Sequence, residues 1–410
     1  MSLVAIVFAV LQTANLASHA LGQTVGVTGK NSQQTLQRSN LKYSVKIHIE
    51  GDQHEISEVI RANSVLVRLQ QQGAADIPSL IVRAQTDQKQ LNAALYKVAR
   101  YGGSIAITID GVPLDRVSLA RPNRSNVRTI AVDIAIKPGP LFRFGYVAIK
   151  QARHNNTNVS DNPGDYGLVS GDIARSDVVV TAADKIIQNW RKAGFPFARV
   201  QGKTIRADHA RQRLDVKITV DTGAPAVYGS IVVSGTQKLK SRVIAEQSAL
   251  QPGAPYNSED LARARERLRK LDVVENVRII EGKELDSRGA LPITIEVKER
   301  KPRYVGVTAS LTTLDGGETS VHWGHRNVFG HGEYLHVEGA LSQIGAAPFD
   351  ELEFDASVTL TKPGSLDIDT SLFVQLQVQR EVSDAFLSDT ARSKIGLTRH
   401  YSPDLSGSVA

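Results

Sequence analysis

Four histidines lie close together in the sequence, and their type and spacing are the first to suggest chemistry. They are His322, His325, His331 and His336. Imidazole nitrogens are common ligands of zinc and other transition metals. In a strand, however, side chains three residues apart point to opposite faces, so His322 and His325 cannot hold one ion without a bulge. We therefore predict no metal site.

Acidic residues offer no better framework for catalysis. Asp165, Asp172 and Asp177 lie near one another in the sequence, but loop carboxylates of this kind are usually solvated. The chain of 410 residues has no cysteine, no glycine-rich phosphate loop and no Gly-x-Ser-x-Gly nucleophile motif. We predict no catalytic residue, no bound cofactor and no enzymatic activity.

The densest basic stretch lies in a segment with helical periodicity. It contains Arg263, Arg265, Arg267, Arg269 and Lys270. One interpretation is a solvated helix face whose charges pair with Glu259 and Glu266. The other is that Arg263 and Arg267 contact anionic lipid headgroups. The net charge of +7 is compatible with an acidic partner or a lipid surface, and we predict no nucleic-acid partner.

The segments that carry these residues belong to a recurring unit. Alternating strands run into glycine- or proline-containing turns and then into new strands at Val132–Gly145, Val216–Gly229 and Ile293–Gly306. Gly145, Gly229 and Gly306 hold matching positions at these junctions, at nearly equal intervals. Before the last two strands of a unit, segments such as Ala183–Ala193 carry apolar residues at helical spacing, which predicts a helix with one buried face.

The third unit shows the pattern most clearly. Pro252 and Gly253 interrupt its helical segment, so two helices are predicted before the second strand. Asn257 or Ser258 can cap the second of these helices. We therefore predict tandem α+β units with the order β-α-α-β-β, in which two helices cover one face of a small sheet.

These units resemble POTRA domains, the polypeptide-transport-associated modules of outer-membrane assembly factors. The predicted boundaries are 42–138 for POTRA 1, 139–222 for POTRA 2 and 223–300 for POTRA 3. The first unit departs from a minimal module by a long polar loop at 111–126, and the second by an Asn-rich loop at 155–167. A signal peptide is expected at residues 1–20 and a flexible leader at 21–41.

From residue 301 onward, helical periodicity gives way to alternation. In Leu352–Leu360 and Leu366–Gln379, apolar residues face one side and polar residues the other. The second segment is longer than most soluble strands and long enough to cross a bilayer. We predict that 301–410 is the N-terminal part of an antiparallel transmembrane β-barrel, with a soluble β-sandwich as the alternative. About six strands are expected, fewer than a closed barrel needs, so the chain is expected to be a fragment.

One short motif lies at the second predicted hairpin of this region. Its residues are Arg326, Asn327, Val328, Phe329, Gly330 and Gly332. The motif resembles the Arg-Asn-Leu-Phe-Gly-x-Gly hairpin near the barrel start of the assembly-factor superfamily, with Val328 in place of Leu. Its glycines permit a tight turn with positive φ, and Asn327 can bond to nearby backbone.

Together, the three units and the motif resemble a TamA-type outer-membrane assembly factor that is truncated within the barrel. The resemblance implies a bacterial outer-membrane protein with periplasmic POTRA repeats, which assembles or translocates outer-membrane proteins, autotransporters included. Clients would bind by strand addition, and the barrel would open along a lateral seam at Tyr304, Gly306 and Val307. The implied partners are unfolded client proteins, the lipid bilayer and a TamB-like, inner-membrane-anchored periplasmic protein. A BamA-like insertase, a two-partner secretion pore and a soluble periplasmic scaffold are the alternatives.

Overall fold

The computed structural model describes residues 41–51, 54–117, 129–152, 157–313, 316–345, 348, 352–383, 386–401 and 405–410. The expected signal peptide and residues 21–40 of the expected leader lie outside these ranges. Parts of the loops at 111–126 and 155–167 lie outside them as well. Among the described residues, no helix is long and apolar enough to cross a membrane.

The first repeat contains more elements than predicted. They are β1 (Tyr43–Ile49), α2 (His54–Asn63), α3 (Val65–Arg68), α4 (Ile77–Lys97), β2 (Ser104–Ile109), β3 (Val112–Pro113) and β4 (Ile130–Lys137). The sheet order is β1-β4-β2-β3. A third helix, α3, is present because Ser64 caps it by accepting the N–H of Val67 at 3.1 Å. The buried carboxylate of Asp87 in turn accepts the Ser64 hydroxyl at 2.8 Å.

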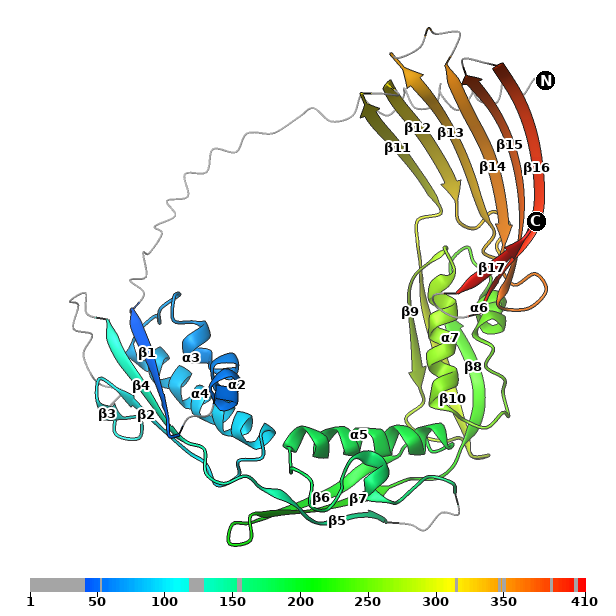
Figure 1. The fold of residues 1–410 in the computed structure, drawn as a ribbon. Coiled ribbons are helices and arrows are strands. Elements are labelled where there is room, and N and C mark those ends of the chain that lie inside the picture. Colours follow the sequence, from blue (N-terminus) through cyan, green and yellow to red (C-terminus); the bar gives the residue numbers. More distant parts are fainter. Residues whose placement is uncertain are drawn as a thin grey trace, which may run out of the picture. The chain divides into compact units, whose positions relative to one another are not determined.

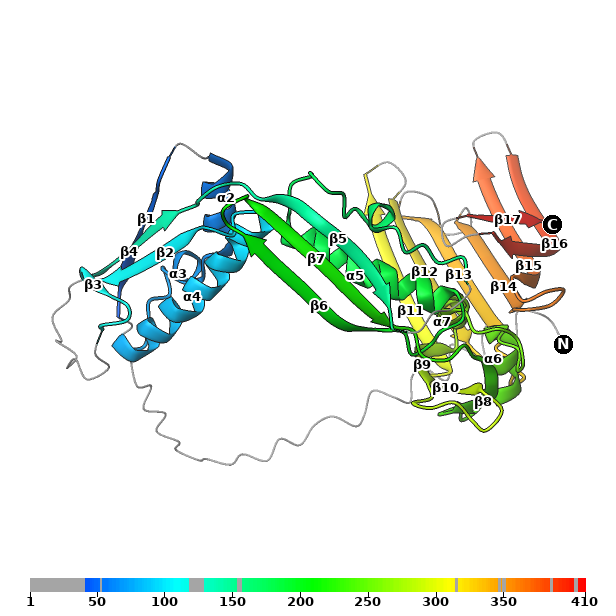
Figure 2. The same ribbon diagram turned by 90° about the horizontal axis from the view of Figure 1, so that it is seen from below.

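The second repeat departs from the predicted helix pair in the other direction. It contains β5 (Arg143–Gln151), the short 3-10 helix η2 (Pro163–Tyr166), α5 (Ser176–Lys192), β6 (Arg199–Asp208) and β7 (Arg213–Asp221). A 3-10 turn replaces the first helix, because Pro163 and Gly164 follow Asn162, whose side chain caps the turn. In the sheet, β7 lies between β5 and β6, and α5 lies along one face (Figure 2). As the periodicity predicts, Ile186 and Trp190 lie on the buried face of α5.

The third repeat has the predicted order β-α-α-β-β. It consists of β8 (Val227–Ser234), α6 (Ser241–Ser248), α7 (Ser258–Lys270), β9 (Val274–Glu281) and β10 (Ala290–Glu299), with the sheet order β8-β10-β9 (Figure 1). Helix α6 ends where Ala249 adopts a left-handed φ of 55°. Helix α7 begins after Asn257, whose side chain accepts the N–H of Glu259 at 2.8 Å. Both helices pack on one apolar core with the sheet.

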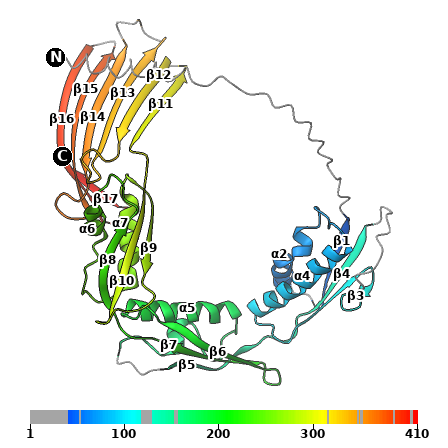
Figure 3. The ribbon, with the colours of Figure 1, turned by 180° about the vertical axis from the view of Figure 1, so that it is seen from behind.

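The described residues from 303 onward form one antiparallel sheet of seven strands in sequence order (Figure 3). They are β11 (Arg303–Thr312), β12 (Gly316–His325), β13 (Tyr334–Ile344), β14 (Glu353–Lys362), β15 (Thr370–Ser383), β16 (Phe386–His400) and β17 (Ser406–Val409). Alternating antiparallel strands are therefore confirmed, and the described residues form seven of them where about six were expected.

One strand boundary was predicted wrongly. Strand β15 begins at Thr370, whereas Leu366 and Ile368 lie in the preceding turn. The carboxylate of Asp367 closes that turn by accepting the N–H of Asp369 at 3.0 Å and the hydroxyl of Thr370 at 2.8 Å. The apolar alternation continues through the turn, which is why the sequence alone could not place its end.

Candidate functional site

The predicted hairpin motif forms the turn between β12 and β13. Gly330 and Gly332 have φ of 91° and 83°, so both adopt the left-handed region that favours glycine. The buried side chain of Asn327 accepts the N–H of Gly332 at 2.9 Å. The Asn327 side chain therefore stabilises the turn through a bond to its backbone, as the motif predicts.

A buried carboxylate completes this turn. Glu333 accepts the backbone N–H groups of Phe329 at 3.3 Å and His331 at 3.0 Å. Burial would raise the pKa of Glu333, but these hydrogen bonds to its charged form outweigh burial and lower the pKa. Glu333 lies one residue beyond the predicted motif, and sequence reasoning missed it.

The motif turn is bonded to the third repeat. The N–H of Lys240, just before α6, donates to the carbonyl of Gly330 at 3.0 Å, and the Lys240 ammonium lies 2.9 Å from Nε2 of His331. The loop that carries Lys240 is itself fixed. The carboxylate of Glu299, at the end of β10, accepts the N–H groups of Gln237, Lys238 and Leu239.

Arg326 connects the third repeat, the motif and the first strand of the sheet. Its Nε lies 3.0 Å from a carboxylate oxygen of Asp272, which follows α7, and only 15% of its side chain is exposed. The guanidinium also lies over the ring of Tyr304 in β11, at 4.3 Å, and donates to the carbonyl of Lys301 at 2.9 Å. Arg326 thus contacts the third repeat at Asp272, the connecting segment at Lys301 and the sheet at Tyr304.

Two glycines let aromatic rings lie flat on neighbouring strands. In the register of β11 and β12, Tyr304 pairs with Gly324 and Gly306 pairs with His322. A Cβ atom at Gly324 would collide with the Tyr304 ring, and one at Gly306 would collide with the His322 imidazole. Gly306, predicted as a seam residue, therefore provides the space that the His322 ring occupies. Its neighbour Val307 is exposed on the opposite face of β11.

The Tyr304 ring reaches across β12 to the third strand. Its hydroxyl bonds to the hydroxyl of Tyr334 and lies 2.9 Å from Nδ1 of His336, both in β13. This network fixes the start of β11, which is an edge strand of the sheet.

One face of the sheet is apolar from β11 to β16. The register brings its residues together across the strands as Val305, Val307, Leu311, Val321, Trp323, Val337, Phe354, Val358, Leu360, Val374, Leu376, Val378 and Ile395. Many are solvent-accessible, including Val305 at 70%, Leu311 at 84% and Ile395 at 67%. Such a broad exposed apolar surface needs a covering.

The opposite face is polar, with Gln375, Gln377 and Lys394 on β15 and β16. His322 and His336 share this face, with ring centroids 5.8 Å apart, whereas His325 lies on the apolar side beside Trp323. The strand therefore separates His322 from His325 as its alternation predicts. In the part of the chain that the structure describes, no group of His, Asp and Glu side chains could hold a metal ion.

The other sequence-predicted side chains lie apart. Asp177 pairs with Arg175 at 2.9 Å, while Asp165 accepts the hydroxyl of Ser160 in its own loop. At the repeat junctions, Gly145 lies against Asp215 and Gly229 against the backbone of Leu291, where a Cβ atom would crowd each of them. Each of these two glycines adjoins an irregularity in its strand register. The lack of a side chain at these two glycines thus allows the neighbouring strands to approach closely.

The two arginines for which lipid contact was one of the two interpretations form ion pairs within the protein. Arg267 is 3.4 Å from Asp369 in the turn before β15 and donates to the carbonyl of Ser248 at 3.1 Å. Arg263 bonds to Asp260 within α7. This pairing agrees with the helix-face interpretation of the basic stretch.

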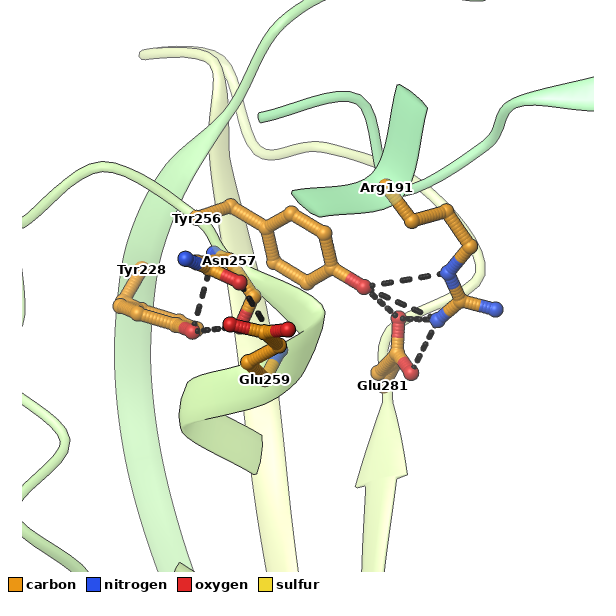
Figure 4. Close-up of polar contacts among 6 residues, drawn as sticks. All are labelled: Arg191, Tyr228, Tyr256, Asn257, Glu259 and Glu281. Carbon is orange, nitrogen blue, oxygen red and sulfur yellow. Dashed lines mark hydrogen bonds and ion pairs between the residues drawn. The ribbon is translucent and has the colours of Figure 1, made fainter. Parts of the chain in front are cut away.

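A charged joint connects the second and third repeats (Figure 4). The guanidinium of Arg191, at the end of α5, donates to both carboxylate oxygens of Glu281 in β9, at 2.6 and 2.7 Å. It also donates to the Tyr256 hydroxyl at 2.9 Å, and that hydroxyl donates to Glu281 at 3.0 Å. Burial raises the pKa of Tyr256, which keeps the hydroxyl protonated. Sequence reasoning missed this joint.

A largely apolar groove of about 420 Å³ lies beside β6 in the second repeat. Its lining includes Tyr96, Tyr101, Val180, Ile205 and His209. Among the described residues, β6 pairs with β7 alone, so its other edge is open beside this groove. An extended segment could pair with this edge and place alternate side chains in the groove.

Residues 226–300 match the family model of POTRA, the surface antigen variable number repeat. The third repeat is a POTRA domain. BamA from Haemophilus ducreyi lacking POTRA domains 1–3 is similar with a TM-score of 0.50 at 15% identity, over 63% of this chain and 47% of that one. This chain thus spans about half the length of that BamA. CdiB from Escherichia coli has a TM-score of 0.37 at 13% identity, over 79% and 54% of the two chains. No curated protein sequence matches the chain.

The predicted fold class is confirmed. In the described residues, POTRA-type α+β domains precede a large antiparallel sheet of seven strands, consistent with part of a barrel. The sequence match itself covers the third repeat, whose two helices follow the predicted order most closely.

Proposed function

We propose that this protein assembles or translocates outer-membrane proteins, with its POTRA repeats in the periplasm and its sheet in the outer membrane. The observation that carries the proposal is the apolar face of β11–β16 in a chain that also contains a POTRA domain. Antiparallel strands with one apolar and one polar face are the form in which β-structure crosses a bilayer. We propose no catalytic step, because strand pairing alone can hold and release a client.

Strand lengths support the membrane placement. β15 has 14 residues and β16 has 15, more than the roughly 9 to 11 that a tilted strand needs to cross the hydrocarbon core. A soluble sandwich, the alternative from another class, would have to cover Val305, Leu311 and Ile395 with a second sheet. Among the described residues, the seven strands form a single sheet.

Client binding is best supported at β6. In the first repeat, the end of β2 is already paired with β3, at Thr108 and Ile109. In the third, the end of β9 is held by the bond between Arg191 and Glu281. β6 has ten residues, an open edge and the adjoining groove. Backbone pairing there would accept many client sequences.

The lateral seam is proposed at β11, with Tyr304, Gly306 and Val307 near its start. β11 is one edge of the sheet, and its backbone groups away from β12 are available to a further strand. A client strand that pairs with this edge could pass sideways into lipid.

The three POTRA-type repeats among the described residues favour the TamA-type interpretation, with a TamB-like periplasmic partner. A BamA-like insertase and a two-partner secretion pore share the repeat-and-barrel plan and remain the alternatives. A pull-down of inner-membrane-anchored periplasmic proteins with the full chain would separate them, since only the TamA-type reading predicts such a partner.

Site-specific photocrosslinking tests the client site. A photoreactive amino acid at Ile205 in β6 should crosslink an unfolded outer-membrane client. Val232 in β8 is the matched control, because it is also apolar, on an edge strand and similarly exposed, at 53% against 50%. Equal crosslinking at both positions would contradict strand addition at β6.

A further inference from the structure

We propose that a basic rim below the apolar face binds phospholipid headgroups beside the seam strand. The basic rim consists of Lys238, Lys240, Arg303 and Lys362, with the exposed ring of Phe329 among them. This inference extends the proposed function, since it requires that the apolar face contact lipid.

The apolar face changes character toward its end near the third repeat. The cross-strand pair Val307 and Val321 is followed by Val305 and Trp323, and then by Arg303 and His325. All six residues share one face, because they alternate with the polar positions of the same strands. Aliphatic, aromatic and basic residues thus succeed one another, the order of a membrane core followed by its headgroup layer.

The rim continues along this end of the sheet. Lys362, the last residue of β14, pairs with Leu372 and so lies on the apolar side as well. Phe329 projects from the motif turn with 63% of its surface exposed. An exposed aromatic ring at this level suits the interface between acyl chains and headgroups.

The third repeat supplies two further cations at this level. Lys238 and Arg303 both lie within electrostatic range of His325. The Lys240 side chain lies against Gly330 in the motif turn. Glu299 holds the backbone of Lys238, so the ordering of this loop does not depend on lipid. A preformed set of cations binds with a smaller loss of entropy.

Three of the four rim cations are unpaired in the part of the chain that the structure describes. Among the described residues, Lys238, Arg303 and Lys362 form no ion pair, and the Lys240 ammonium contacts only the imidazole of His331. Arg263 and Arg267 are instead paired with Asp260 and Asp369. The phosphates of a lipid leaflet fit the rim better than a free anion does, because the cations line the end of an apolar face and form no enclosed pocket.

Spin-labelled lipids test the rim on the full chain reconstituted in bilayers of phosphatidylcholine and phosphatidylglycerol. Electron paramagnetic resonance gives the fraction of each labelled lipid that the protein immobilises. We expect selectivity for phosphatidylglycerol, reduced several-fold by Lys238→Glu with Arg303→Glu and less by the corresponding Gln changes. The control is Arg288→Glu, which makes the same kind of charge reversal away from the rim. Arg288 precedes the start of β10, whereas Glu299, which holds the Lys238 loop, is the last residue of β10. This variant should leave the selectivity unchanged.

The outcomes separate the two proposals. Equal selectivity in the parent protein and the Lys238→Glu, Arg303→Glu variant would overturn the basic rim, while immobilised lipid would still support the membrane sheet. Loss of selectivity on adding millimolar inorganic phosphate at constant ionic strength would also overturn it, since the rim would then be a free-anion site. Absence of immobilised lipid around the parent protein would contradict both proposals.

Discussion

The guanidinium of Arg326 lies over the ring of Tyr304, with its Cζ atom 4.3 Å from the ring centroid. The same guanidinium pairs with Asp272 of the third repeat. Tyr304 belongs to the proposed seam strand β11, and its hydroxyl bonds to Tyr334 two strands away. The Arg326 side chain can therefore transmit a movement of the third repeat to the seam strand.

Replacing Arg326 should loosen the start of β11. Arg326→Lys keeps the charge but loses the planar stack, and we expect faster hydrogen–deuterium exchange at Tyr304 and Val305 and a loss of about 2 kcal/mol in stability. Arg300→Lys is the matched control, because Arg300 also approaches Asp272, at 3.9 Å, but is more exposed. Exchange in β11 that is equal in the two variants would count against the connection.

A methyl group at Gly306 should disrupt β11 because it collides with His322. We expect Gly306→Ala to lower the unfolding temperature in detergent, and the added change His322→Ala to restore most of the loss. Gly339→Ala is the control, since a Cβ atom there meets no neighbour. If His322→Ala gives no rescue, the glycine serves some purpose other than space for the ring.

The joint at Arg191 should limit motion between the second and third repeats. Arg191→Lys removes the two-pronged bond to Glu281 and the bond to Tyr256, so the repeats should sample more orientations. Because the chain has no cysteine, spin labels can be placed at Lys203→Cys and Ser234→Cys without background. We expect a broader distance distribution, and an unchanged one for Arg242→Lys, whose partner Glu246 lies in the same helix. Identical widths would show that other contacts fix the joint.

The motif turn should weaken in acid. The pKa of Glu333 is lowered in the folded protein, so its carboxylate contributes stability above its ordinary value of 4.5, and this contribution is lost as the pH falls through the lowered pKa. We expect Glu333→Gln to cost about 1 to 2 kcal/mol at neutral pH and progressively less below pH 4.5. Urea unfolding across this range measures the difference. A constant difference at every pH would contradict the assignment.

Local patterns in the sequence predicted the elements whose causes are local. The break at Pro252 and Gly253, the cap at Asn257 and the glycine turn at Gly330 all depend on residues a few positions apart. The extra helix of the first repeat and the 3-10 turn of the second were not predicted. Each depends on one residue, the helix cap Ser64 or the helix breaker Pro163, in a stretch that is otherwise ordinary.

The contacts that make the site were not predictable in this way. Arg191 and Glu281 are 90 positions apart, and nothing near either residue indicates the other. Arg326 was identified as part of a turn motif, but its contact with Asp272 depends on how the third repeat meets the sheet. The sequence left lipid contact at Arg267 open as one of two interpretations, because the ion pair with the distant Asp369 could not be predicted from it.

The most direct test of the account is whether the apolar face of the sheet contacts lipid. Single spin labels placed at successive positions from Phe373 to Val378 in β15 should alternate in their accessibility to lipid and water in bilayers. We predict that labels at Val374, Leu376 and Val378 collide mainly with oxygen dissolved in the lipid. Labels at Gln375 and Gln377 should collide mainly with a water-soluble nickel chelate. Uniform access to the chelate along the strand, in a chain that stays monomeric in buffer without detergent, would contradict it.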